Sequence, residues 1–347
     1  MPKLILWVRC SDAGSGKSGD MKKYFFPLLR KVFNGITTLF FLICIIFLLL
    51  RLAPGNPVHK FVSPEFSPEL SEKIYNSFNL NAPLHEQFLS FLANIISLNF
   101  GISYIYRQPV FEVIMNYFPF TLMFAFIVFF IQTAGSIVLS LYSFKKKNCW
   151  QDRFFNEISL IIYSIPTFVL AVLLILFFSV WLQIFPSAGI TSFNPDENDF
   201  FLFAAERINY LFLPVMTLSI IGTAYFYRYL RENMDMADSA PFTLLLKSNG
   251  LSRNGILIKH ILPNSVFPLI SVAGIEIGML LSGALITETI FALPGMGRLT
   301  VSSILQRDYP LVTGCAFVSG LCVILSNIAA DFIKSIIDSR IAGDLIE

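Results

Sequence analysis

The chain contains few charged residues. Asp, Glu, Lys and Arg make up 14% of its 347 residues, whereas 55% are apolar and 37 are phenylalanine. A soluble domain of ordinary composition is about one quarter charged. This deficit excludes an ordinary soluble domain and predicts a membrane protein.

Paired cysteines, clustered histidines and a nucleotide-binding loop are also lacking. None of the five cysteines, at 10, 44, 149, 315 and 322, falls in a predicted outer loop, which argues against a disulfide framework. The histidines are scattered singly and form no recognisable metal site; they are His59, His85 and His260. The segment AGSGKS at 13–18 is not a phosphate-binding loop, because Ser11 stands where that loop requires its first glycine.

Six apolar segments are long enough to cross the hydrocarbon layer as helices, which takes about 20 residues. They lie near 32–50, 118–142, 158–182, 209–229, 265–290 and 311–333. The first is too long for the core of a signal peptide, and Arg51 follows it instead of a small-residue cleavage site. Pro166 is expected to kink the third segment. The sequence therefore predicts an all-α membrane protein with six transmembrane helices.

The positions of lysine and arginine predict how these helices are oriented. With alternate loops on opposite sides, 18 of the 25 Lys and Arg residues fall on the side of both termini and of the loops at 143–157 and 230–264. The other side receives six, and Arg51 lies at a boundary. Because cytoplasmic loops carry the excess of positive charge, both termini and these two loops are predicted to be cytoplasmic. The loop at 143–157 is short and basic and offers nothing catalytic.

A polar stretch at 235–263 separates the fourth and fifth spans. Pro241 suits the first turn of a helix, and Gly250 suits the left-handed residue that ends one. A second short helix, from 253 to 262, is predicted to lead back to the membrane. Two short helices joined at a glycine would form a rigid projection that a partner could grip.

Three groups of residues carry a resemblance to a known family. In the polar loop, Gly250 is followed twelve and thirteen residues later by Leu262 and Pro263, although three leucines at 244–246 replace the usual Glu-Ala-Ala. The outer side has an exit turn, RLAPGNPV at 51–58, and an entry into the second span formed by Gly101, Ser103, Pro109, Val110, Pro119, Thr121 and Leu122. An outer-face block at 287–310 contains Glu288, Phe291, Pro294, Gly295, Gly297, Arg298, Leu299, Arg307, Asp308, Tyr309 and Pro310. Over about residues 21–341 the chain resembles the inner-membrane permease subunits of dipeptide, oligopeptide and nickel ABC importers.

The resemblance implies the type I ABC importer permease fold. It divides the chain into a cytoplasmic N-terminal extension at 1–31, a first transmembrane helix at 32–50, an outer segment with an interfacial helix at 51–117, a five-helix core at 118–341 with the coupling loop at 235–263, and a cytoplasmic tail at 342–347. Residues 1–20 are expected to be disordered or to precede the true start at Met21. In the outer segment, one helical face at 84–95 is apolar, as expected of a helix along the interface.

The resemblance also implies a non-catalytic subunit in the cytoplasmic membrane of a bacterium. Such a subunit pairs with a second homologous permease, receives peptides from an extracytoplasmic binding protein and is driven by two ATPase subunits, which hold the ATP and magnesium. This chain is expected to bind no cofactor and no nucleic acid, and nickel or another small solute is the alternative cargo. The residues expected to couple to the ATPase are Leu246, Ser248, Asn249, Gly250, Leu251, Ser252, Leu262 and Pro263.

Glu276 lies in the middle of the fifth predicted span. Gly274, Gly278 and Ser282 recur at every fourth position, where they would let another helix approach closely. Two residues turn a helix by about 200°, so Glu276 faces a different neighbour. Because a carboxylate at mid-bilayer costs about 2.5–3.5 kcal/mol on insertion scales, Glu276 is predicted either to line a pathway or to contact another subunit. In the outer-face block, Glu288, Arg298, Arg307 and Asp308 are expected to be free to pair with one another.

Two other classes of membrane protein remain as alternatives. A secondary transporter would show several ionisable residues along the path of its coupling ion, whereas only Glu276 and Asp331 are visible here. A membrane-embedded enzyme would need a constellation of His, Ser or carboxylate side chains at membrane depth, and the sequence contains no recognisable one. ATPase subunits that copurify in mild detergent would separate the importer from both.

Overall fold

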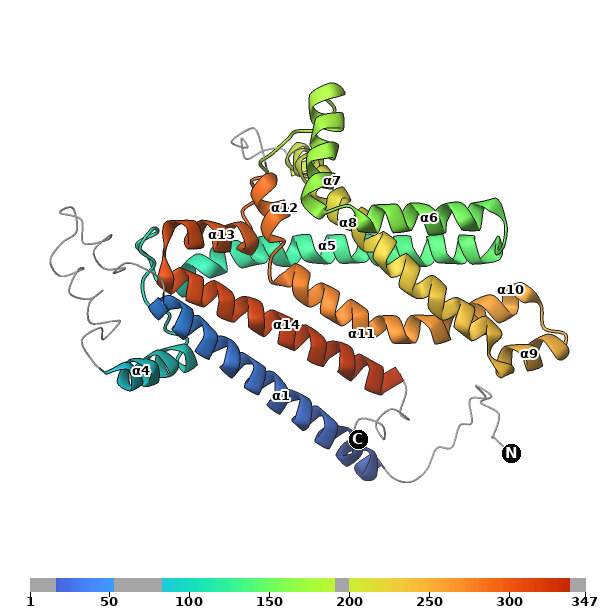
Figure 1. The fold of residues 1–347 in the computed structure, drawn as a ribbon, viewed down its shortest axis with the longest axis horizontal. Helices are drawn as coiled ribbons and strands as arrows, with labels where there is room; N and C mark the ends of the chain where they lie inside the picture. Colours follow the sequence, from blue (N-terminus) through green and yellow to red (C-terminus); the bar gives the residue numbers. More distant parts are fainter. Residues whose placement is uncertain (1–16, 53–82, 191–199, 338–347) are drawn as a thin grey trace.

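A computed structural model describes residues 17–52, 83–190 and 200–337 (Figure 1). Several expectations lie wholly or partly outside these residues. They concern the extension at 1–20, most of the exit turn at 51–58 and the tail at 342–347.

The described chain is built from helices. In chain order they are α1 (Lys17–Leu52), α4 (Leu84–Ile96), α5 (Val110–Lys145), α6 (Trp150–Ser164), α7 (Thr167–Leu174), the π-helix η1 (Ile175–Trp181), α8 (Phe200–Ser239), α9 (Pro241–Ser248), α10 (Arg253–Ile256), the π-helix η2 (Leu257–Ile261), α11 (Leu262–Leu281), α12 (Leu285–Ile290), α13 (Met296–Gln306) and α14 (Tyr309–Ile337). Within the described residues the strand-like pairing is limited to an isolated bridge between Ile102 and Pro109.

Among the residues that the structure describes, five helical stretches are long and apolar enough to cross a membrane. They are Leu29–Leu49, Val110–Lys145, Glu206–Ser239, Arg253–Ile290 and Tyr309–Ile337. The remaining apolar segment is a bent pair, Trp150–Ser164 and Thr167–Trp181, whose axes differ by 101°. The prediction of six spans holds if this pair counts as one broken span.

The break in the third span lies at Pro166, where the sequence predicted a kink. Proline lacks the N–H that would continue the helix, and it pushes the preceding residue out of helical geometry. Ile165 accordingly has an extended backbone with φ −78° and ψ 125°. The kink expected at Pro166 is therefore present as a sharp turn of 101° before α7, and α6 begins at Trp150, before the segment predicted near 158–182.

The glycines of the fifth span let α11 pack closely against α14. A Cβ placed on Gly278 would lie 3.0 Å from the Cα of Val323, and Gly274 faces Ala330 in the same way. The hydroxyl of Ser319 donates to the carbonyl of Ser282 at 3.0 Å. The stripe of small residues thus forms a helix contact within the chain, as expected of such a pattern.

The helix predicted in the outer segment is present as α4. Its apolar face packs against α1, where the ring of Phe47 lies 5.2 Å from that of Phe88 and 5.4 Å from that of Phe91. Ile95 joins Ile43 and Phe317 in one cluster. The face expected to lie along the membrane interface is therefore covered by α1 and α14.

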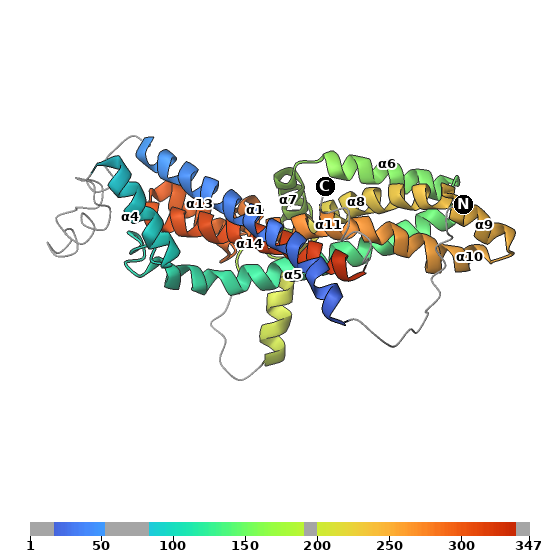
Figure 2. The ribbon, with the colours of Figure 1, turned by 90° about the horizontal axis from the view of Figure 1, so that it is seen from below.

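The two ends of the molecule carry different elements. Figures 1 and 2 show α4 and α13 at one end and α9 and α10 at the other. The charge distribution predicts that the first end lies outside the cell and the second in the cytoplasm.

A labelling experiment tests this orientation. In a variant whose five cysteines are replaced by serine, a cysteine at the exposed position of Gln108 should react in intact cells with a membrane-impermeant thiol reagent. A cysteine at the exposed position of Asn254 should react only after the membrane is opened. The reverse pattern would overturn the predicted topology.

Candidate functional site

The loop between the fourth and fifth spans begins later than expected. Helix α8 continues to Ser239, so residues 235–239 belong to the helix and not to the loop. The next helix, α9, begins at Pro241, as predicted, because proline in the first turn needs no N–H partner. The hydroxyl of Thr243 donates to the carbonyl of Ala237 at 2.7 Å and fastens the start of α9 to the end of α8.

Gly250 ends α9 in the left-handed conformation that the sequence predicted, with φ +76°. Its N–H donates to the carbonyl of Lys247 at 3.1 Å, and the N–H of Leu251 donates to that of Leu246 at 3.3 Å. These two bonds make the Schellman cap of a helix C-terminus. A Cβ on Gly250 would meet nothing within 4 Å, so the glycine is needed for its backbone geometry and not for space.

The prediction of a separate second short helix at 253–262 is wrong, because this segment is continuous with the fifth span. Ser252 caps its start by accepting from the N–H of Gly255 at 3.2 Å, and α10 begins at Arg253. The chain then passes through η2 directly into α11. Pro263 lies where η2 joins α11, and Leu262 and Pro263 do not interrupt the helical stretch Arg253–Ile290.

The tip of this loop presents apolar side chains to solvent. Leu244 is 61% exposed and Leu251 is 40% exposed, and all residues from Lys247 to Asn254 are exposed. Leu246, one of the residues predicted to couple to the ATPase, is half-buried and packs against a cluster that contains Leu230 and Ile256. The projection therefore has an apolar base, formed by Leu246 and the cluster beneath it, and an exposed rim, formed by residues 247–254.

A group of charged side chains at this end of the molecule was missed by the sequence interpretation. The guanidinium of Arg231 in α8 donates to both carboxylate oxygens of Asp152 in α6, at 3.3 and 3.1 Å. Arg231 also pairs with Asp235. Asp235 lies one helical turn after Arg231, but Asp152 is 79 residues away in the sequence, too far for a pattern to connect them.

Lys147, in the loop at 143–157, joins the same group. Its ammonium lies 2.7 Å from Asp235 and 3.2 Å from Asp238, and Asp238 lies 2.8 Å from Lys247 of α9. Burial by itself would lower the pKa of Lys147, but its hydrogen bonds to the two carboxylates outweigh this effect and raise that pKa above its ordinary value. The loop that was expected only to mark the cytoplasmic side thus contacts the coupling region.

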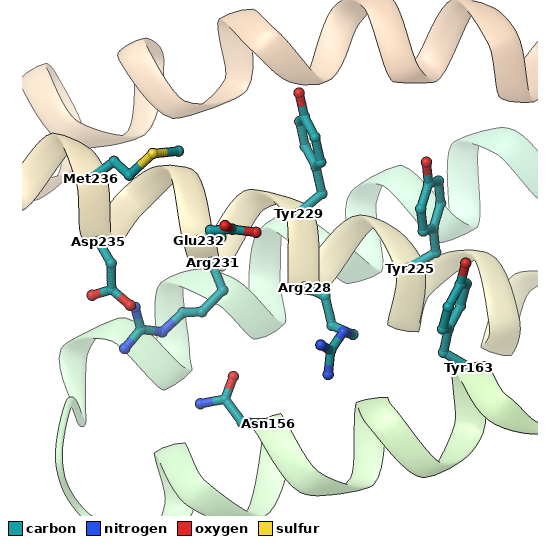
Figure 3. Close-up of a pocket in the computed structure, with 9 residues that line it drawn as sticks. All are labelled: Asn156, Tyr163, Tyr225, Arg228, Tyr229, Arg231, Glu232, Asp235 and Met236. Carbon is teal, nitrogen blue, oxygen red and sulfur yellow. The ribbon is translucent and has the colours of Figure 1, made fainter.

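A pocket of about 580 Å³ lies beside this group, between α6 and α8 (Figure 3). Asn156 and Tyr163 reach it from α6, and Arg228 and Glu232 reach it from α8. The ring of Tyr163 stacks on that of Tyr225 with the centroids 5.7 Å apart. The pocket wall is therefore aromatic toward one end and charged toward the other.

Glu276 lies on the side of α11 away from the glycines that contact α14. It is partly buried and lies near the carboxamide of Gln132 in α5 and near Tyr225 of α8. Gln132 is completely buried, and among the described residues its carboxamide has no hydrogen-bond partner. Two polar side chains from different spans therefore meet at membrane depth.

The outer-face block is organised around Glu288, which is completely buried. Its carboxylate accepts from the N–H of Ala284 at 3.2 Å, from the N–H of Arg298 at 3.1 Å and from the hydroxyl of Thr121 at 3.4 Å. A Cβ on Gly297 would lie 2.8 Å from the amide nitrogen of Leu285, and one on Gly295 would meet the carboxylate of Glu288. The glycines of this block make room for α12 and α13 to close around one carboxylate.

Asp308 has a similar role at the start of α14 and is also completely buried. Its carboxylate accepts from the hydroxyl of Ser103 at 2.5 Å and from the N–H groups of Ile105 and Leu311, at 3.1 and 3.2 Å. Asp308 thus fastens the turn before α5 to the start of the last span.

The expectation that the charges of this block pair with one another is therefore corrected. Both carboxylates bind backbone N–H groups and hydroxyls, which a buried carboxylate needs to replace water. The guanidinium of Arg298 donates to the carbonyl of Ala292 at 2.7 Å, and Arg307 ends α13 in a left-handed conformation. Phe291 packs in the core, and its carbonyl accepts from the N–H of Gly189 at 2.8 Å.

Comparison with known families decides what this architecture is. Residues 136–343 match the family described as binding-protein-dependent transport system inner membrane component, and residues 24–125 match the N-terminal part of such components. The chain belongs to this family. It is an inner-membrane permease of the type I ABC importer fold, and its multiple apolar helices agree with a multi-pass membrane protein.

Relatives of this permease match it along most of its length. An oligopeptide transport system permease protein, AppB of Bacillus subtilis, is 31% identical over 315 residues, which is 90% of this chain and 98% of that protein. A probable peptide ABC transporter permease of Sinorhizobium fredii, y4tP, is also 31% identical over 315 residues, with the same coverage. The nickel import system permease protein NikB of Staphylococcus aureus is 29% identical over 316 residues, or 90% of each chain. Within the described residues no group of three His, Cys, Asp or Glu side chains is arranged to hold a metal ion.

The proximity of Glu276 to Gln132 yields a prediction for transport by this permease. Glu276→Gln keeps a polar side chain beside the buried carboxamide and should change uptake little. Glu276→Leu has a similar size but puts an apolar side chain there, which a hydrated pathway for a polar solute would not tolerate. We expect several-fold slower uptake in the leucine variant, measured as initial rates at equal membrane levels. Equal rates in the two variants would restrict Glu276 to packing.

Proposed function

We propose that this chain is one of two transmembrane subunits of an ABC importer that moves peptides into the cell. A binding protein outside the membrane would deliver the peptide, and two cytoplasmic ATPases would drive the transport cycle. The chain itself would be non-catalytic, with ATP and magnesium held by those ATPases. The coupling unit would be the loop at 235–263, within the division of the chain set out above.

The observation that carries this proposal is the loop between α8 and α11. Its exposed leucines are Leu244 on the short helix α9 and Leu251 just after it, and the Schellman cap at Gly250 joins the two. An exposed apolar group on a rigid support is typical of a protein interaction site. An energy-supplying partner that gripped this projection would be able to move the spans at its base.

The substrate assignment rests on the relatives and on the chemistry of the interior. The peptide and oligopeptide permeases match at slightly higher identity than the nickel permease. Polar groups from three spans, Glu276, Gln132 and Tyr225, meet at membrane depth. Such groups suit a hydrated pathway for a polar solute, since they are costly against lipid. We place the pathway along this face, where a second permease subunit would complete it.

The test combines copurification with transport. The chain, expressed with its candidate partners, should copurify with two ATPase subunits and a second permease in mild detergent. Reconstituted vesicles should then accumulate labelled peptides only when binding protein and ATP are present on their proper sides. Accumulation of nickel instead of peptides would reassign the cargo. Transport driven by an ion gradient without ATP would show a secondary transporter.

A further inference from the structure

Five ion pairs form one continuous chain from α6 to the coupling helix α9. Asp152 of α6 pairs with Arg231 of α8, and Arg231 pairs in turn with Asp235. Lys147 then bridges Asp235 and Asp238. The chain ends where Asp238 pairs with Lys247 of α9. The pairs join α6 to α8 and α8 to α9, and Lys147, in the turn between α5 and α6, bridges two carboxylates of α8.

The chain changes from buried to exposed along its length. The side chain of Arg231 is 6% exposed and that of Asp152 is 9% exposed, whereas that of Lys247 is 46% exposed. The buried end is held firmly, because removing one member of such a pair leaves an uncompensated charge. The exposed end contributes little to stability, since surface ion pairs are typically worth about 0–1 kcal/mol. The pairs near α9 are therefore poorly explained as stabilising contacts alone.

The ring of Phe144 supports the middle of the chain. The guanidinium of Arg231 lies 5.0 Å from its centroid, and the ammonium of Lys147 lies 5.3 Å from it. Cations over an aromatic face are attracted to it, so the ring favours this placement of both charges. Phe144 is itself buried in the cluster against which Leu246 of α9 packs. The ionic and the apolar contacts of α9 therefore converge on the same residue.

At its other end the chain fixes the start of the broken third span. Asp152 also accepts from the hydroxyl of Ser143, from the N–H of Asn148 at 3.2 Å and from the amide of Asn156 at 3.2 Å. Helix α6 runs straight from this anchor to the 101° bend at Pro166. A displacement of Asp152 would therefore be carried along α6 to that bend.

We propose that Lys147 and Asp238 are positioning residues that transmit movement of α9 to α6. This inference rests on the proposed function, in which a partner displaces α9. The movement then passes from Lys247 through Asp238 to Lys147, which lies just before the start of α6. The third span changes shape at the bend at Pro166. The turn after α5 is then part of the coupling unit, together with the loop around Gly250.

The test replaces Lys147 by methionine, which keeps the unbranched stem on Phe144 and removes the charge. Lys146→Met is the matched control, because Lys146 is exposed and makes no ion pair within the residues described here. In the reconstituted importer we expect Lys147→Met to bind the ATPase subunits normally and to hydrolyse ATP, with uptake per ATP reduced roughly tenfold, within the usual range of coupling energies. Lys146→Met and Lys147→Arg should behave like the wild type.

Two further variants separate positioning from loss of folding. Lys247→Met removes only the exposed end of the chain and should also lower uptake per ATP without lowering the amount of protein in the membrane. Lys147→Met combined with Asp238→Asn should be no worse than Lys147→Met alone, because residues acting through one contact are not additive. Additive losses would overturn the proposal.

A distance measurement tests the mechanical link without any partner. Spin labels at Arg153 of α6 and Ser248 of α9, both exposed, should give a narrow distance distribution in the wild type and a broader one in Lys147→Met. Unchanged distances and unchanged uptake per ATP in Lys147→Met would overturn the inference while leaving the proposed function intact. A wild-type chain that binds no ATPase would overturn the proposed function, and the inference with it.

Discussion

Gly250→Val is expected to reach the membrane at a near-normal level and to abolish uptake. Gly250 has φ +76°, and its Cβ position is open, so the effect comes from the backbone and not from a clash. A left-handed backbone costs a residue with a Cβ about 1–2 kcal/mol, and a β-branched residue tolerates it worst. The valine therefore favours another backbone conformation, which breaks the two bonds of the Schellman cap.

Loss of that cap changes how α9 is presented to a partner. The N–H of Leu251 no longer reaches the carbonyl of Leu246, so the exposed rim moves relative to the base that packs on α8. The spans should still insert, because their apolar length is unchanged. We expect weak binding of the ATPase subunits, or hydrolysis that loaded binding protein no longer stimulates.

The matched control is Gly250→Asn, since asparagine tolerates the left-handed conformation far better than valine. It should keep most of the uptake and most of the stimulated hydrolysis. Membrane level by immunoblot, ATPase copurification and initial uptake rate are measured for both variants. Normal uptake and normal stimulation in Gly250→Val would mean that the loop is only a connector.

Glu288→Ala is expected to have the opposite outcome and to remove most of the folded protein from the membrane. The buried N–H groups of Ala284 and Arg298 lose their acceptor. Each unsatisfied group costs about 1–3 kcal/mol, which for two groups is about 2–6 kcal/mol, a large part of the stability of a typical domain. Without this carboxylate, no shared acceptor would hold α12 and α13 together.

Two further substitutions serve as a control and as an intermediate case for this prediction. Glu86→Ala, at an exposed glutamate of α4, should leave the amount and the melting temperature of the purified protein unchanged. Glu288→Gln keeps one acceptor oxygen and should fall between the wild type and the alanine variant. The measurements are the yield of monodisperse protein in detergent and its thermal unfolding. A Glu288→Ala protein with wild-type yield and melting temperature would show that the carboxylate does not hold the block together.

Local properties of the chain were predictable from the sequence. The apolar segments indicated the spans, because insertion depends on the hydrophobicity of about 20 consecutive residues. Pro241 and Gly250 indicated the ends of α9, because both act through their own backbone angles. The outer-face block and the spacing from Gly250 to Pro263 indicated the family, which the comparison confirmed.

Features that depend on which segments meet were decided by the tertiary structure. Lys147 and Asp238 are 91 residues apart, and Ser103 and Asp308 are 205 residues apart. No periodicity connects such positions, so Lys147 was read as a marker of the cytoplasmic side and Asp308 as a partner for arginine. A buried charge must find donors wherever the folded chain provides them. The hydrophobicity of the sequence by itself determined that this protein crosses the membrane, because insertion is a local property, whereas packing between distant helices decided which charges pair around the end of α8.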